Sequence, residues 1–533
     1  MAPTTADEQS WEIEDPSDKT WDVVIVGSGM GGSTTAFALA QRGIDVLVVE
    51  KGSLLHKAGH APNDGEPIDE TLGHWPHKLA FQSNVGNGEV HAYLGCGSGG
   101  STIAYGGVLE RLAPVDFTPG KFFRDTSEAD VPDRWPVSFE DLLPYYRQAE
   151  QLFRVKGTPD PIYGVEEDSL MEPPELNSKD QAIFDHLRKK GLSPYRLHLG
   201  SEFDPNCKYC QGYCPRTCRN DAAKMCLVPA MKTGRVKFLG NCTVRKMEAG
   251  QSSVDSLICD RGGTEVRVRG KVFVLAAGAY GTALLLLNSA SRAWPNGLAN
   301  NSGMVGRNLM MHTTDFFAIW PRGMGNRRDF SRTVALRDLY VADGVKLGMI
   351  QSAGVKTNWG LVLQFLRDYC DRHPAGWMRL VKPFLPPMAM IGAVLFNRAI
   401  VMATVMEDLP YANNRVVPDD AAPGGFRVEY EYTDELRKRN QILRTKIREK
   451  FGRNRVAFLL ERKNNLNFGH PCGTCRFGDD PANSVLDRNN KAHGVDNLYV
   501  ADASFFPSSA GVNPSLTIAA NALRVADQIS SRL

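Results

Sequence analysis

The sequence predicts an α/β protein in which two domains are interleaved along the chain. Three observations predict this fold class. The chain has 533 residues, more than one compact core usually organises. An apolar strand, a Gly-rich turn, an Ala-rich helix and a second apolar strand follow one another between Trp21 and Gly52, the pattern of a Rossmann-like unit. Two more segments of strands and helices, 236–289 and 464–533, lie far downstream. The blocks between the three segments are loop-rich or have only short strand-like runs.

The two downstream segments each end in a predicted helix. The middle segment contains the strand-like runs VKFLGNCTVRKM, SSVDSLICD and EVRVRGKVFVLAAG, followed by the helical GTALLLLNSA. The last segment contains the strand NLYVADAS and the helix NPSLTIAANALRVADQI. Apolar runs of this length, bounded by turn residues, are typical of buried strands.

The intervening blocks predict a second domain. Residues 117–224 are loop-rich, and residues 310–463 contain short strand-like runs and the charged helix TDELRKRNQILRTKIREKF, which Thr433 caps. We therefore predict a flexible N-terminal tail at residues 1–19. The nucleotide-binding domain is predicted to comprise residues 20–116, 225–309 and 464–533, and the substrate-binding or cap domain residues 117–224 and 310–463.

Composition and charge argue against some classes of binding partner. The chain is 42% hydrophobic and 23% charged, and its 62 basic and 60 acidic residues give a net charge of +2. This balance indicates neither nucleic-acid binding nor a polybasic membrane patch. The polar, acidic start MAPTTADEQSWEIEDPSDKT is unlike a secretory signal, so we expect a cytoplasmic enzyme. The apolar run Pro383–Phe396 is too short to span a bilayer and holds three prolines, so we expect no transmembrane segment. The oligomeric state is left open.

Gly27, Gly29 and Gly32 form G-x-G-x-x-G between a strand and a helix, and Glu50 ends the next strand. The first glycine permits a tight turn, the second admits a pyrophosphate and the third lets the helix pack on the sheet. A lone G-x-G-x-x-G is weak evidence, but this strand–turn–helix–strand–Glu context predicts dinucleotide binding. Glu50 lies at the expected distance to hold the adenosine ribose hydroxyls, and its charge would repel a 2′-phosphate, which disfavours NADP. The turn alone does not separate FAD from NAD.

Further motifs carry a family resemblance. They are YLGCGSGGSTIAYGG at Tyr93–Gly107, then VFVLAAGAYGTALLLLNSA, VGRNLMMH, GHPCGTCRFG, NLYVADASFFPSS and GVNPSLTIAANA. With the first turn, they resemble the glucose-methanol-choline (GMC) family of flavoprotein oxidoreductases. The match runs in order from Val23 to Ile529, strong in the nucleotide segments and weak in the substrate blocks. The resemblance implies a Rossmann-like FAD-binding domain with a discontinuous α+β substrate domain built on an antiparallel sheet.

The resemblance also implies which residues bind FAD. They lie on the two Gly-rich loops, on the strand that contacts adenine, on the turns after two later strands and at the start of the last helix. Relatives that attach FAD covalently often carry a His in the second Gly-rich loop, where this chain has Ala104 and Tyr105, so we predict non-covalent FAD. Tyr105 also stands where many relatives have Asn. The predicted FAD-binding set is Gly27, Gly29, Gly32, Glu50, Gly97, Gly100, Ser101, Thr102, Val244, Ala277, Gly278, Asp502, Ala503, Pro514 and Thr517.

Two residues are predicted to catalyse the reaction. Oxidation of an alcohol by flavin needs a hydride path from the carbinol carbon to flavin N5 and a base near the hydroxyl, and neutral histidine suits that role. The resemblance implies His470 in GHPCGTC as this base and Asn513 in GVNPS as its partner, which hydrogen-bonds the substrate oxygen. For His312 we expect a structural role bonded to backbone, and for Glu407 a surface or packing role rather than access to the cavity.

Cys207, Cys210, Cys214 and Cys218 form a short cluster among eleven cysteines. Four thiolates this close can hold a metal or an iron–sulfur cluster, as a similar run does in some related sugar dehydrogenases. The spacing differs here, so we favour a thiol-rich loop or a local disulfide, with no metal. An iron–sulfur cluster is kept as the first alternative and a zinc site as the second. The pair Cys472 and Cys475 is expected to pack rather than to be redox-active.

The leading hypothesis is oxidation of a primary or secondary alcohol to an aldehyde or ketone. The electrons would leave to O2 or to an electron carrier. Sterol oxidase and sugar or aminoglycoside alcohol dehydrogenase are alternative substrate assignments, and a lyase with structural FAD is an alternative of another class. Aromatic residues in the second substrate block are more often core than cavity lining, so the sequence does not name the small-molecule alcohol.

Overall fold

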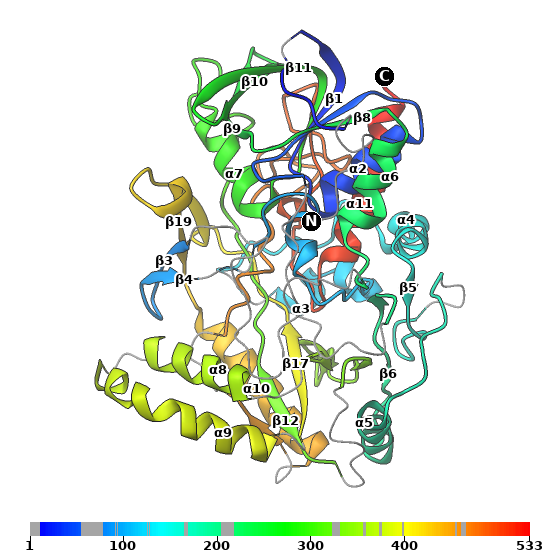
Figure 1. The fold of residues 1–533 in the computed structure, drawn as a ribbon, viewed down its shortest axis with the longest axis vertical. Coiled ribbons are helices and arrows are strands. Elements are labelled where there is room, and N and C mark those ends of the chain that lie inside the picture. Colours follow the sequence, from blue (N-terminus) through cyan, green and yellow to red (C-terminus); the bar gives the residue numbers. More distant parts are fainter. Residues whose placement is uncertain are drawn as a thin grey trace.

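The computed structural model describes residues 11–16, 18–54, 78–90, 92, 94–124, 126, 128–164, 169–203, 218–321, 331–354, 359–372, 376–396, 399–452, 456–459 and 465–533. Figure 1 shows two sheets arranged along the long axis. A mixed sheet with helices lies in the upper half, and an antiparallel sheet lies in the lower half. Both are assembled from segments that are distant in sequence.

Parallel strands form the centre of the upper sheet. The order is β8-β2-β1-β11, and β21 pairs with the other edge of the C-terminal half of β11. These Val-rich strands are buried on both faces, as parallel strands covered by other layers are. Their bounds are β1 Thr20–Val26, β2 Val46–Val49, β8 Val236–Leu239, β11 Thr264–Leu275 and β21 Leu498–Val500.

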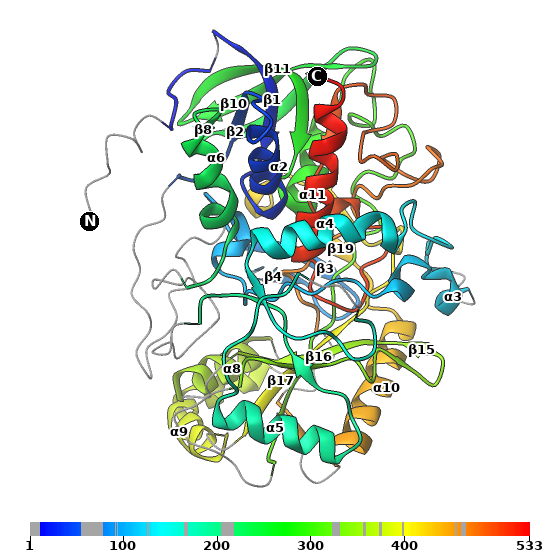
Figure 2. The same cartoon turned by 90° about the vertical axis from the view of Figure 1, so that its right-hand side faces the viewer.

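The rest of the nucleotide domain covers this sheet. The first half of β11 continues antiparallel into β10 (Val254–Arg261) and β9 (Thr243–Ala249). Helices α2 (Met30–Ala40) and α11 (Ser515–Ser530) pack against each other, and Figure 2 shows them side by side on one face. Helix α7 (Gly278–Asn288) contacts β9 instead.

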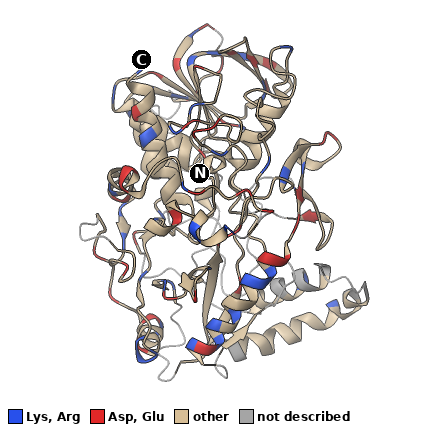
Figure 3. Ribbon diagram, turned by 180° about the vertical axis from the view of Figure 1, so that it is seen from behind, with Lys and Arg blue, Asp and Glu red and all other residues tan. Residues whose placement is uncertain are grey.

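The lower sheet has the order β20-β12-β17-β16-β13-β6, and every neighbouring pair is antiparallel. This confirms the predicted α+β domain on an antiparallel sheet. Helix α10 (Asp434–Phe451) begins where predicted, because the Thr433 side chain accepts a hydrogen bond from the Leu436 amide at 3.3 Å. Figure 3 shows the basic and acidic residues along this helix. The strands are β6 Tyr195–Arg196, β12 Phe316–Ile319, β13 Val334–Leu336, β16 Gly348–Ser352, β17 Ile400–Met406 and β20 Val456–Phe458.

Shorter elements connect the two sheets. The remaining strands are β3 Leu79–Ser83, β4 Gly88–Val90, β5 Val155–Lys156, β7 Leu199–Gly200, β14 Val341–Ala342, β15 Val345–Lys346, β18 Arg415–Pro418 and β19 Phe426–Tyr430. The remaining helices are η1 Gly100–Ile103, η2 Pro114–Phe117, α3 Gly120–Phe123, α4 Phe139–Leu152, α5 Ser178–Lys189, η3 Ala223–Leu227, α6 Val228–Lys232, α8 Trp359–Arg372, η4 Gly376–Phe384, α9 Leu385–Phe396, η5 Pro423–Gly425 and η7 Ala503–Phe505. No helix in the described ranges is long and apolar enough to cross a membrane.

Residues 11–13 of the predicted N-terminal tail pair with strand β8. Trp11 is buried, the Ile13 amide donates to the Phe238 carbonyl at 3.0 Å, and the Phe238 amide donates to the Trp11 carbonyl at 2.9 Å. Strand β8 is the edge of the parallel sheet, so its outer backbone groups need partners and this segment supplies them. The first twenty residues are polar on average, so their composition did not indicate that Trp11 is buried against the sheet.

Strand pairing also links segments of the two predicted domains. β3, which lies in the predicted nucleotide segment 20–116, pairs in parallel with β19 of the predicted substrate segment. Val428 lies opposite Phe81 in this register, and β18 and β4 complete a four-stranded sheet. The domain boundaries stay predictions.

Candidate active site

Four of the predicted FAD-binding positions lie at the C-terminal edge of the parallel sheet. Gly27 follows β1, Glu50 follows β2, Ala277 follows β11 and Asp502 follows β21. The Gly278 amide donates to the Asp502 carboxylate at 2.9 Å, which joins the last two turns. In open α/β sheets ligands bind at this edge, so the topology collects these motifs where a dinucleotide is expected.

Close packing explains why α2 begins with glycines. A methyl group at Gly32 would lie 2.0 Å from the carbonyl oxygen of Gly27, consistent with the packing role predicted for the third glycine. A methyl group at Gly31 would lie 1.9 Å from the carbonyl oxygen of Ala501, just after β21. The G-x-G-x-x-G pattern leaves position 31 open, so this requirement was not predicted from the sequence.

The two Gly-rich loops face each other. The Gly99 amide donates to the Ser28 carbonyl at 3.0 Å, and the Ser28 hydroxyl donates to the Gly97 carbonyl at 3.1 Å. At Gly100, φ is +51° and a methyl group would lie 2.8 Å from the Gly29 Cα atom. At Gly29 the nearest atom to an added methyl group is 4.0 Å away. This backbone-lined arrangement at the N-terminus of α2 fits a pyrophosphate.

Glu50 joins these loops, which the sequence analysis did not foresee. Its buried carboxylate accepts hydrogen bonds from the Ser28 amide at 2.9 Å, the Ser28 hydroxyl at 2.8 Å, the Gly52 amide at 3.0 Å and the Gly97 amide at 3.2 Å. These four donors use the acceptor positions of the carboxylate. A ribose contact would have to replace one of them, so that role of Glu50 stays a prediction. The Cys242 amide donates to the Glu50 carbonyl at 2.9 Å, which places the start of β9, and hence Val244, nearby.

Other predicted FAD-binding side chains differ in exposure. The Ser101 side chain is exposed, and its hydroxyl accepts a hydrogen bond from the Gly95 amide at 3.0 Å. The Thr102 hydroxyl is buried, donates to the Gly99 carbonyl at 2.6 Å and accepts from the Ala222 amide at 2.9 Å. The Thr517 hydroxyl lies 2.9 Å from the Tyr146 hydroxyl. Cofactor contacts at these positions, and at Ala503 and Pro514, stay predictions.

The predicted base, His470, lies directly against His312. The segments that carry His312 and His470 pair with each other. The Met310 amide donates to the Cys472 carbonyl and the Cys472 amide donates to the Met310 carbonyl, each at 3.0 Å. This pairing brings the two Nδ1 atoms to 3.1 Å, with the rings perpendicular. His312 is wholly buried, whereas His470 keeps part of its surface exposed.

The hydrogen bonds fix which nitrogen of each ring carries a proton. His312 Nε2 lies 3.1 Å from the carbonyl oxygens of both Ser509 and Ala510, so it must be the protonated nitrogen. A neutral His312 then presents a bare Nδ1, which accepts from His470 Nδ1–H. The Asn467 amide nitrogen, at 3.4 Å from His470 Nδ1, is a longer and weaker contact. His470 Nε2 is therefore left as an unprotonated acceptor. The expectation that His312 bonds backbone is confirmed.

Burial keeps both rings neutral. Burial, reinforced by the neighbouring His312, lowers the pKa of His470 to about 3. Burial lowers the pKa of His312 to about 4, although the carbonyl groups of Ser509 and Ala510 oppose this shift. At neutral pH His470 is thus in the form that a general base requires.

Asn513 ends a braced loop directly before α11. The Trp135 indole donates to the Ser508 hydroxyl at 2.8 Å, and the Gly511 amide donates to the Tyr340 hydroxyl at 3.0 Å. Asn513 Oδ1 is buried and has no hydrogen-bond partner among the residues that the structure describes. Because buried acceptors are seldom left unpaired, this atom is free to accept a hydrogen bond from a bound molecule. His312 links this loop to His470.

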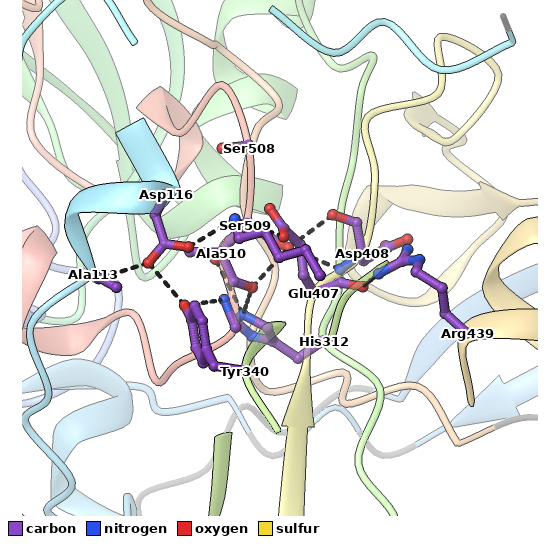
Figure 4. A network of polar contacts seen from close by, with 12 residues as sticks. Ala113, Asp116, His312, Tyr340, Glu407, Asp408, Arg439, Ser508, Ser509 and Ala510 are labelled. Carbon is purple, nitrogen blue, oxygen red and sulfur yellow. Dashed lines mark hydrogen bonds and ion pairs between the residues drawn. The ribbon is translucent and has the colours of Figure 1, made fainter. Parts of the chain in front are cut away.

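A buried charge network lies beside this loop (Figure 4). The Tyr340 hydroxyl donates to the Asp116 carboxylate at 2.7 Å. Lys346 Nζ lies 2.7 Å from Asp116 and 2.8 Å from Glu407, and all three side chains are fully buried. Burial raises the pKa of Glu407, and Lys346 opposes the shift. Glu407 therefore packs inside rather than on the surface. Lys346 and Asp116 belong to no motif and were not predicted.

The cysteine cluster lies mostly outside the described residues, because these exclude Cys207, Cys210 and Cys214. Cys218 is buried. Among the described residues no group of three or more His, Cys, Asp or Glu could hold a metal ion. Cys472 and Cys475 are buried free thiols, and burial raises the pKa of each, which supports packing rather than redox reactivity.

Comparisons with known proteins bear on the whole chain. Residues 133–314 and 401–522 match the family description GMC oxidoreductase, and residues 22–63 match FAD dependent oxidoreductase. The chain is 31% identical to 6'''-hydroxyparomomycin C oxidase of Streptomyces lividus over 97% of this chain and 92% of the relative. It is 29% identical to paromamine 6'-oxidase of Streptomyces fradiae over 99% of this chain and 94% of the relative. Pyridoxine 4-oxidase from Mesorbium loti has a similar fold, with a TM-score of 0.62 at 20% identity, covering 96% of this chain and 99% of that structure.

Proposed function

Because the chain belongs to the GMC oxidoreductase family, we propose that His470 is the general base of an FAD-dependent alcohol oxidation. The observation that carries this proposal is the neutral His470 ring with its Nε2 left unprotonated by the contact to His312. The product is an aldehyde or a ketone, according to whether the alcohol is primary or secondary.

The chain supplies a site that fits FAD. The facing backbones of the two Gly-rich loops and the N-terminus of α2 would hold the pyrophosphate. When bound, FAD accepts the hydride equivalent from the carbinol carbon. We propose that it binds non-covalently, since Ala104 offers no nucleophile and the Tyr105 hydroxyl donates to the Asn220 carbonyl at 2.6 Å.

His470 and Asn513 divide the work on the alcohol. His470 Nε2 would take the hydroxyl proton, and positioned bases of this kind contribute about 10²–10⁴ in rate. Asn513 cannot take a proton, so its side-chain N–H would donate a hydrogen bond to the substrate oxygen, whose own proton goes to His470. His312 is a positioning residue, because it fixes the tautomer and orientation of His470 without facing the substrate.

An amino-sugar alcohol is the first substrate class that we propose. Both relatives named above are oxidases whose names specify paromomycin- or paromamine-type compounds. The electron acceptor is proposed to be O2 or an electron carrier. We also propose a cytoplasmic location, which is supported by the eight cysteines in the described part of the chain all being free.

Anaerobic flavin bleaching tests this function. The yellow holoenzyme is mixed without oxygen with amino sugars, neutral sugars, sterols and aryl alcohols, and the flavin absorbance is followed. We expect rapid bleaching by at least one class, with the amino sugars first. Stable flavin absorbance with every alcohol would contradict alcohol oxidation, and a colourless protein that takes up no FAD on reconstitution would contradict the cofactor assignment as well.

A further inference from the structure

The largest exposed apolar side chains of the described residues gather on one helical arm, formed by residues 359–372 and 376–396. Figures 1 and 2 show its helices α8 and α9 at the lower end of the molecule, remote from the parallel sheet. Eight of the eleven exposed large hydrophobic residues lie there. Seven of them make up what we call the apolar face: Trp377, Leu380, Phe384, Met388, Met390, Ile391 and Val394, which are 48–77% exposed.

The arm has its own small core, which does not use this face. Leu385 and Ala389 of α9 pack against Leu363 and Cys370 of α8, in a cluster separate from the main core. Helix α9 is therefore apolar on the side that α8 covers and apolar again on the exposed side. A helix that is hydrophobic all round is normally covered on every side. Among the residues that the structure describes, only the side of α9 that faces α8 is covered.

The charges of the arm indicate what kind of surface would cover the exposed side of α9. Residues 376–396 include the basic Arg379 and Lys382 and no acidic residue, and the acids of the arm, Asp368 and Asp371, lie on α8. Basic residues set among Trp, Phe, Leu and Met are typical of segments that lie in the interface of an anionic membrane.

The length of α9 sets how such contact would be made. Its twelve residues extend about 18 Å, whereas the hydrocarbon core of a bilayer is about 30 Å thick. The helix is thus too short to span a bilayer but long enough to lie along its surface. We propose that the apolar face docks the enzyme peripherally onto an anionic phospholipid membrane, with Trp377 and Phe384 among the inserted side chains.

Vesicle flotation tests this proposal on the holoenzyme. One set of vesicles contains phosphatidylcholine with roughly one-third phosphatidylglycerol, and the other contains phosphatidylcholine alone. We expect the protein to float with the anionic vesicles, to float less with the neutral ones, and to detach partly near 1 M salt, where the Debye length is about 3 Å. The double variant Ile391→Glu/Val394→Glu should bind anionic vesicles at least about tenfold more weakly, because both side chains lose their apolar insertion.

The matched control is Ile162→Glu, which changes an exposed isoleucine outside the arm and should bind as the wild type does. Flavin absorbance and bleaching by alcohol report the integrity of each variant, and Leu380→Gln replaces the double variant if the latter loses its flavin. Failure of the wild type to float with anionic vesicles would overturn the proposal, and so would equal flotation of arm and control variants. A dimer seen by light scattering, abolished by the double variant and accompanied by no flotation, would overturn it in favour of self-association.

Discussion

At residue 470 the proposed chemistry depends on one nitrogen of the His470 ring. Two carbonyl groups from Ser509 and Ala510 fix the proton of His312, and His312 in turn fixes that of His470. The motif GHPCGTC predicts His470 as the base from the sequence alone, and that role stays a prediction. The tautomer was not predictable, because it depends on carbonyls nearly two hundred positions from His312 in the chain.

The lowered pKa of His470 predicts an unusual acid limit. The base is active when unprotonated, and its pKa is lowered from 6.5 to about 3, so the active form persists as the pH falls through 6.5. We expect the rate constant of flavin reduction at saturating alcohol to change less than about twofold between pH 8 and pH 5. Anaerobic stopped-flow absorbance measures it. Half-loss of the rate near pH 6.5 would show an ordinary, unshifted histidine.

Two substitutions at position 312 separate positioning from packing. His312→Gln retains both a donor for the carbonyls and an acceptor for His470, whereas His312→Leu fills the space and retains neither. We expect His312→Gln to keep most of the flavin-reduction rate. His312→Leu should lose about tenfold or more while retaining FAD, and its acid limit should shift. Equal rates in the two variants would mean that His312 only fills space.

At the scale of elements, the regular parts of the nucleotide domain followed from their patterns. Strands β1, β2 and β8–β11 and helices α7 and α11 lie where apolar runs and turn residues predicted them. In the substrate domain, helix α10 follows its predicted cap, Thr433. The pairing of residues 11–13 with β8, and of β3 with β19, did not follow. Short segments take their conformation from a partner strand, which no local pattern reveals.

Gly31 gives a test in which local propensity and packing oppose each other. Replacing a helix glycine by alanine normally stabilises by about 1 kcal/mol. Here the added methyl group would lie 1.9 Å from the Ala501 carbonyl oxygen, so α2 must shift away from β21. We expect Gly31→Ala to lower both the flavin content of the purified protein and its thermal stability. Gly250→Ala, whose methyl group would meet its nearest atom at 4.0 Å, is the control and should change neither. Full flavin content in Gly31→Ala would contradict this packing argument.

At the scale of the molecule, a buried lysine joins the two predicted domains. Lys346 on β15 of the substrate block pairs with Asp116 on η2 of the nucleotide segment and with Glu407 after β17. None of the three belongs to a recognisable motif, and fully buried charges of this kind are rare. Their pairing depends on how the domains close on one another, which explains why the sequence did not predict it.

Removing this lysine should weaken the whole molecule. Lys346→Met leaves Asp116 and Glu407 buried without their cation, and breaking a buried pair in this way costs roughly 3–5 kcal/mol. Lys446→Met is the matched control, since the pair of Lys446 with Asp343 is partly exposed and worth about 1 kcal/mol or less. Urea unfolding followed by flavin and tryptophan fluorescence measures both. Similar losses of unfolding free energy in the two variants would show that the buried Lys346 network contributes no more than the partly exposed pair of Lys446.

The central claim is that His470 removes the hydroxyl proton while bound FAD takes the hydride. The most direct measurement is anaerobic flavin reduction by a substrate alcohol in His470→Ala beside the wild type. We predict that the variant retains its yellow FAD and is reduced at least about a hundredfold more slowly. Reduction at the wild-type rate in the flavin-loaded variant would contradict the claim.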